Sequence, residues 1–165
     1  MFEDLLNRQL QALAPKSILT VGEAAAALVT IYCRQHPNCE LVCAVTAPEI
    51  ASLLSSPAAR RYDFGVIAGY LETVDEETGG VLIARLRDVL VRRLCVVLSV
   101  ADPIRPAAWT DADMTAFGFT HLERVQKANT DYRIYGFDIA SYKSTPDWLN
   151  PRHWAHPDRW NKERW

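Results

Sequence analysis

The chain has 165 residues, of which 49% are hydrophobic and 23% are charged, and its formal net charge is −2. That length fits one domain with at most a short appendage, and the composition excludes wholesale disorder. No apolar run approaches the roughly 20 residues that span a bilayer, so a membrane protein is not expected. The first residues indicate an acidic amphipathic helix and not a secretory signal, so we expect a cytoplasmic protein.

Hydrophobic periodicity predicts short apolar strands that alternate with helices. The predicted helices cover 2–14, 22–35, 48–54 and 81–93. The predicted strands cover 17–21, 40–46, 62–71 and 94–100. Gly79 and Gly80 are expected to break the chain before the fourth helix, and Arg92 and Arg93 to lie on its solvent side. Apolar strands in this alternation predict an α/β fold with a doubly wound, mostly parallel, Rossmann-like sheet covered on both faces.

The pattern changes after residue 100. A short helix is expected there, capped by Thr110 or Asp111 and ended by Gly118. Alternating polarity over 119–126 and 132–143 then predicts an antiparallel hairpin at the end of the sheet.

The last residues have a chemistry of their own, so we divide the chain into an α/β domain over 1–143 and an extension over 144–165. Four tryptophans recur there at intervals of six, six and five, and residues 143–165 carry a net charge of +2 against −4 for the rest. These are Trp148, Trp154, Trp160 and Trp165.

Burying indole rings is favourable, so we expect this tail to fold back on its own domain. The alternatives are an interface with a protein partner, self-association included, and nucleic-acid binding. The acidic domain disfavours nucleic acid.

Three of the four cysteines, Cys33, Cys39 and Cys43, fall close together and enclose His36. Zinc sites usually present two separated ligand pairs, and Cys43 is expected to point into the sheet. We therefore expect no metal, and buried or half-buried free thiols that include Cys95. A metal at this cluster is the alternative.

The order of elements resembles the class I S-adenosylmethionine-dependent methyltransferase fold. The stretches 17–28, 62–100 and 110–125, the last followed by 132–143, carry this resemblance, and 62–100 is the most specific. It implies a doubly wound sheet that ends in a reversed hairpin strand. Between 47 and 61 there is room for one helix only, so the family's third strand and third helix are expected to be missing, which leaves about six strands.

The cofactor loop departs from the family's acidic-x-Gly-x-Gly-x-Gly pattern. The corresponding positions are Thr20, Gly22, Ala24 and Ala26, so only the first glycine remains. Thr46 replaces the carboxylate that would bind the ribose at the end of the second strand. The family's acidic residue on the adenine side is expected to be missing with the third strand. Charge-assisted hydrogen bonds contribute roughly 1.5–3 kcal/mol each, so losing these two carboxylate contacts is expected to weaken binding by about 10²-fold or more. The sequence establishes no cofactor. The hydroxyls of Thr20 and Thr46 and the carboxylate of Glu23 in the loop are groups that could still bind S-adenosylmethionine, so its binding is the alternative.

The carboxyl ends of the strands form the default ligand site of such a sheet. Candidate residues there are Gly22, Glu23, Thr20, Thr46, Gly69, Tyr70, Glu72 and Asp102. Glu72 and Asp102 form a candidate pair for proton transfer or for binding an amine or hydroxyl ligand, although solvated loop carboxylates that cap helices are the favoured interpretation. No catalytic triad is indicated, and His153 with His156 lacks further metal ligands nearby.

Three functions remain open. The favoured one is a degenerate methyltransferase-like domain, a non-catalytic binding or interaction module of unknown ligand. The second is a small-molecule methyltransferase with an atypical cofactor loop. The third is a different enzyme on the same scaffold, because function depends on the site and not on the fold.

Overall fold

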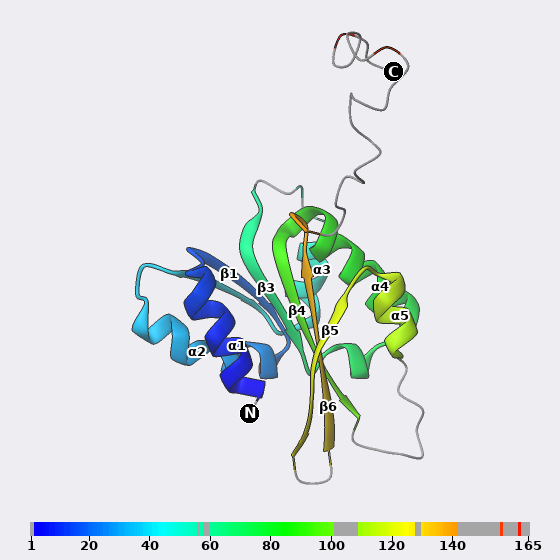
Figure 1. The fold of residues 1–165 in the computed structure, drawn as a ribbon, viewed down its shortest axis with the longest axis horizontal. Helices are drawn as coiled ribbons and strands as arrows, with labels where there is room; N and C mark the ends of the chain where they lie inside the picture. The colour runs from blue at the N-terminus through cyan, green and yellow to red at the C-terminus, as the bar shows by residue number, and fades with distance from the viewer. Residues whose placement is uncertain are drawn as a thin grey trace.

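The computed structural model describes residues 2–55, 57, 60–100, 109–127, 130–141, 156 and 162 (Figure 1). The strands are β1 (Ser17–Val21), β2 (Glu40–Ala44), β3 (Tyr62–Ala68), β4 (Val91–Val100), β5 (Thr120–Lys127) and β6 (Thr130–Asp138). The helices are α1 (Phe2–Leu13), α2 (Glu23–Gln35), α3 (Ala47–Ser55), α4 (Glu76–Arg85) and α5 (Asp111–Ala116). A 3-10 turn, η1 (Leu71–Thr73), and a π turn, η2 (Leu86–Leu90), complete the described elements.

The strands form one six-stranded sheet in the order β2-β1-β3-β4-β6-β5. The pairs among the first four are parallel, whereas β6 runs antiparallel to both β4 and β5. The predicted fold class, with its reversed terminal hairpin, is confirmed. None of the described helices is long and apolar enough to cross a membrane.

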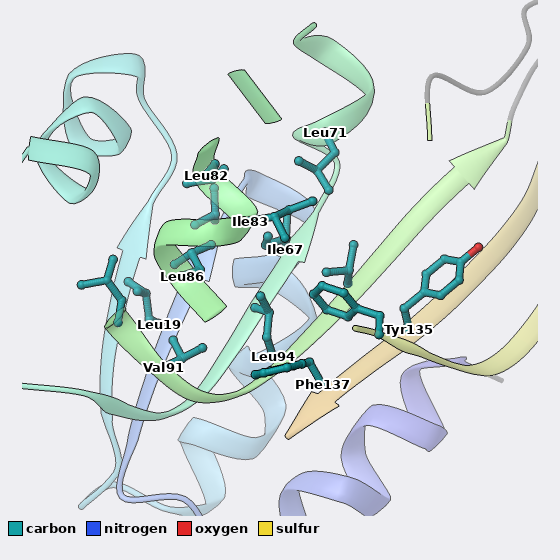
Figure 2. Packing of buried hydrophobic residues seen from close by; sticks show 14 of the residues in the cluster. Leu19, Ile67, Leu71, Leu82, Ile83, Leu86, Val91, Leu94, Tyr135 and Phe137 are labelled. Atoms are coloured by element: carbon teal, nitrogen blue, oxygen red, sulfur yellow. The ribbon is translucent and has the colours of Figure 1, made fainter. Parts of the chain in front are cut away.

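Helices cover both faces of the sheet, and each face has its own core. On one face Leu6 and Leu10 of α1 and Val29 of α2 pack with Phe64 and Val66 of the sheet. On the other face the apolar side of α4 and η2 meets Leu19 and Ile67 (Figure 2). Ile50 of α3 and Met114 of α5 belong to this second core.

The direction of winding reverses at β1. The chain passes from β1 to β2 on one side, and then returns so that β3 pairs with β1 on its other side. Right-handed crossovers therefore place α2 and α3 on opposite faces. In an open α/β sheet a ligand binds at the carboxyl ends of the two strands where the winding reverses, which here are β1 and β3.

The prediction for the fourth helix was wrong at both of its ends. The helix begins at Glu76, because the Asp75 side chain caps it by accepting a hydrogen bond from the Thr78 N–H at 2.8 Å. Gly79 and Gly80 lie inside the helix rather than before it. Glycine is needed at 79, since a Cβ there would lie 2.6 Å from the ring of buried Trp109.

Arg92 and Arg93 belong to β4 and not to the helix. The π turn ends the helix at Leu90, and β4 begins three residues earlier than predicted. Arg93 then faces Asp138 across the β4–β6 ladder, and its Nε lies 2.7 Å from the carboxylate. The predicted strand over 62–71 ends at Ala68, because Gly69 has a φ of +73°.

The short helix α5 follows its prediction. Thr110 is its N-cap and forms a reciprocal capping box with Asp113, and Gly118 ends the turn with a φ of +81°. Asp111, the alternative cap, instead accepts a hydrogen bond from the Tyr135 hydroxyl. The hairpin is confirmed, although β6 ends at Asp138 and not at residue 143.

Gly79→Ala and Gly80→Ala should have opposite effects on stability. Alanine lowers the intrinsic cost of a helical position by about 1 kcal/mol relative to glycine. At 80 a Cβ meets only ordinary contacts, 3.4 Å from Phe117, so we expect Gly80→Ala to stabilise the protein. At 79 the overlap with Trp109 dominates, because overpacking costs about 1–3 kcal/mol. Urea unfolding of both variants checks this, and equal stabilisation of the two would contradict the packing described for Trp109.

Candidate functional site

Gly22 is the first residue after β1 and lies at the reversal point. Its φ is +96°, and its N–H donates to the Ala44 carbonyl at 3.0 Å. A Cβ at this position would overlap the carbonyl oxygen of Ala68 at the end of β3. Both the backbone conformation and the close approach therefore require glycine.

Ala24 and Gly69 bring the two loops at the reversal point together. Gly69, which follows β3, has a φ of +73°, and a Cβ there would lie 3.2 Å from the Ala24 Cβ. We call the region at the carboxyl ends of β1 and β3 the mouth of the sheet. Both residues are exposed, so the Ala24 methyl lies at the surface of this mouth. A methyl group at Ala24 thus stands where the family's loop has its second glycine, and it faces the loop after β3. Glu23, beside it, is exposed and lies in the first turn of α2.

Thr20 does not reach this mouth. Its side chain is fully buried, and among the described residues its hydroxyl has no hydrogen-bond partner. Strand residues two apart share a face, and Ile18 lies in the core beneath α1 and α2. Thr20 therefore points under α2, where a carboxylate in its place would be buried.

A carboxylate does lie at the end of β2, although it is not at Thr46. The side chain of Glu49 accepts hydrogen bonds from the N–H groups of Val45 and Thr46 at 2.9 and 2.8 Å. These backbone bonds, Thr46 first, lower the pKa of Glu49, and the side chain is exposed. Thr46 and Glu49 have the spacing of a helix capping box, which is the sequence signal that would have assigned Glu49 to this position.

Glu72 is engaged in a structural contact. Its carboxylate accepts hydrogen bonds from the Ser99 N–H at 2.6 Å and from the Ser99 hydroxyl at 3.0 Å. It thereby joins η1 to the end of β4. Tyr70, just before η1, is half-buried against the core beneath α4. Asp102 lies outside the described residues, so the proposed pairing of Glu72 with Asp102 stays a prediction.

The cysteines are free thiols. Burial raises the pKa of Cys33, that of Cys39 to about 11 and that of Cys95 to about 12, so these three thiols are poor nucleophiles. The prediction for Cys43 was wrong: it is exposed, because β2 is the edge strand of the sheet. The described residues contain no group of three His, Cys, Asp or Glu side chains that could hold a metal.

The four tail tryptophans and His153 lie outside the described residues. His156 and Lys162 of the tail are exposed. The predictions for the tail therefore stay predictions at this point.

Thr20→Val should stabilise the protein. A buried hydroxyl without a partner costs about 1–3 kcal/mol, and valine keeps the shape of threonine while removing that hydroxyl. Thr20→Ser is the matched control, because it keeps the hydroxyl, loses a methyl and should destabilise by about 1 kcal/mol. Chemical denaturation measures both, and a destabilised Thr20→Val would show that the hydroxyl has a partner.

No curated protein matches the chain by sequence. Among solved structures, a putative O-methyltransferase from Nostoc punctiforme superposes with a TM-score of 0.56 at 15% identity, over 81% of this chain and 54% of that one. The 1,6-didemethyltoxoflavin-N1-methyltransferase of Burkholderia thailandensis, with S-adenosylhomocysteine bound, gives 0.54 at 16%, over 81% and 74%. Magnesium protoporphyrin IX methyltransferase from Synechocystis, also with S-adenosylhomocysteine, gives 0.51 at 12%, over 82% and 80%.

These similarities confirm the expected methyltransferase-like fold, and at such identities they show the fold alone. The chain spans about half the length of the Nostoc protein. The profile of DUF6231, a family of unknown function, matches residues 1–165. The chain therefore belongs to the DUF6231 family.

Proposed function

We propose that this chain is a methyltransferase-like domain without methyl-transfer activity, which serves as a binding or interaction module. The observation that carries the proposal is the position of the Ala24 methyl at the point where the winding of the sheet reverses, so near to the loop after β3 that a Cβ at Gly69 would lie 3.2 Å from it. A nucleoside cofactor held in the family's manner needs bare backbone there, and a methyl takes that space.

The charges of the mouth support the same proposal. The position that is acidic in the methyltransferase pattern is Thr20, which is buried beneath α2 and offers no group to a ligand in the mouth. Glu72 is engaged with Ser99. These residues do not fit S-adenosylmethionine as the family holds it.

Glu49 favours a second candidate, a small-molecule methyltransferase that holds its cofactor in an altered way. Its carboxylate lies at the end of β2, where the resemblance places the ribose-binding acid. It is exposed, and its lowered pKa keeps it ionised at neutral pH. Such a carboxylate is able to accept hydrogen bonds from two neighbouring hydroxyls. Similar folds crystallised with S-adenosylhomocysteine are consistent with this alternative.

Calorimetric titration of the full-length protein with S-adenosylmethionine and S-adenosylhomocysteine separates the two candidates. We expect no heat of binding up to millimolar ligand, which corresponds to less than about 4 kcal/mol of binding free energy. Micromolar binding of either ligand would contradict the impaired cofactor site and favour the enzyme candidate, whose methyl transfer an activity assay would then test.

Three variants sharpen that titration. If micromolar binding is found, Glu49→Gln should weaken it by about ten- to a hundredfold, because a charge-assisted hydrogen bond contributes about 1.5–3 kcal/mol, whereas Glu23→Gln should not. If none is found, Ala24→Gly with Thr46→Asp restores the space and the charge that the family pattern contains. Binding by that double variant alone would identify these two positions as the cause of the loss.

A further inference from the structure

An apolar groove lies near the amino ends of β3 and β4, which is the end of these strands opposite the mouth. Its volume is about 450 Å³, within the range of about 300–1,000 Å³ typical of ligand pockets. Phe64, Leu94 and Phe137 contribute to its lining from the sheet. Leu13 from the end of α1 and Leu122 from β5 line it as well.

Both of these leucines are among the exposed large apolar residues of the described chain. Leu13 and Leu122 are each 38% exposed, and Ile139, which follows the lining residue Asp138, is 41% exposed. They come from α1, from β5 and from the turn after β6. Two exposed leucines that line one groove from separate segments, with a third exposed apolar side chain next to a lining residue, indicate a surface that something covers.

The local backbone builds the groove. Ala14 has a φ of +43°, so α1 ends abruptly and leaves Leu13 at its rim. Gly136 of β6 has no side chain, which lets Leu122 lie across it, since a Cβ at 136 would be 2.8 Å from Leu122 Cδ1.

The chain itself supplies a suitable occupant. Ser141 is the last residue of the continuous described chain, and it lines the groove. Trp148 follows seven residues later, a span of at most about 25 Å when extended. It is the tryptophan of the tail with the shortest loop to close, so docking it costs the least chain entropy. The tail and the domain carry opposite net charges, so electrostatics do not oppose the contact.

We propose that Trp148 docks into the groove between Leu13 and Leu122 of its own chain, so that the C-terminal tail covers this part of the sheet. An indole ring buries about 150–250 Å² of surface, and the groove provides apolar partners for it. The contact is intramolecular and does not depend on what binds at the mouth.

Acrylamide quenching of tryptophan fluorescence in the full-length protein tests this. Trp109 is buried and gives a constant background. Leu122→Arg and Leu13→Arg each place a charge in one wall of the groove and should raise quenching and shift the emission to longer wavelength. Val81→Arg is the matched control, because Val81 is 55% exposed on α4, which packs on the other face of the sheet.

The Trp148→Ser background identifies the docked ring. There Leu122→Arg should have no further effect on quenching, whereas it should keep its effect in Trp165→Ser. Trp148→Ser alone should remove a shielded emitter and Trp165→Ser should not, a comparison that holds even if an arginine variant fails to fold.

Three results would overturn the proposal. The first is equal quenching for the groove variants and Val81→Arg. The second is a Leu122→Arg substitution that still raises quenching in the Trp148→Ser background, where the buried Trp109 contributes only a constant signal. The third is shielding that is lost on dilution of a self-associating protein, because the ring would then dock on a second copy.

Discussion

The passage of the loop after β1 directly over the end of β3 is the constraint on which the rest of this structure depends. Gly22 tolerates no side chain there, since the carbonyl of Ala68 occupies that space. This contact fixes the start of α2 relative to β3. It also places Ala24 close to the loop at Gly69. The close approach of Gly22 to β3 therefore limits the space that remains for a ligand at the mouth.

Most of the fold could be predicted because its strands are apolar and its helices periodic. The strand at 17–21 and the capped helix near Thr110 needed only local chemistry. Gly79 and Gly80 led to a wrong prediction of where α4 begins, because glycine usually marks a break in a helix. Here the ring of Trp109, thirty residues away, explains the glycine at 79. Such a tertiary contact leaves no trace in a local pattern. The same holds for Arg93 of β4, which forms an ion pair with Asp138 on the neighbouring strand β6.

The candidate site was predictable in outline but not in the orientation of its side chains. The reversal point follows from element order, so Gly22 and Gly69 could be placed there. That Thr20 points beneath α2 depends on which face of β1 each residue takes, a matter of strand register. Glu49 differs, because the capping-box spacing from Thr46 would have located its carboxylate at the end of β2. Ser99 as the partner of Glu72 could not be foreseen, since 27 residues separate them.

The absence of a strand beyond β2 in the described sheet has a consequence for solubility. An outermost strand offers its unpaired amides and carbonyls to any extended peptide, and a protein must discourage such pairing. β2 is short, only five residues, and Glu40 at its start forms an ion pair with Arg60. Six of the eight residues of the opposite border strand, β5, are polar or charged, and the other two are Leu122 and Val125. The shortness of β2 and the charged residues of β5 thus disfavour the pairing of these edge strands with a strand of a neighbouring molecule.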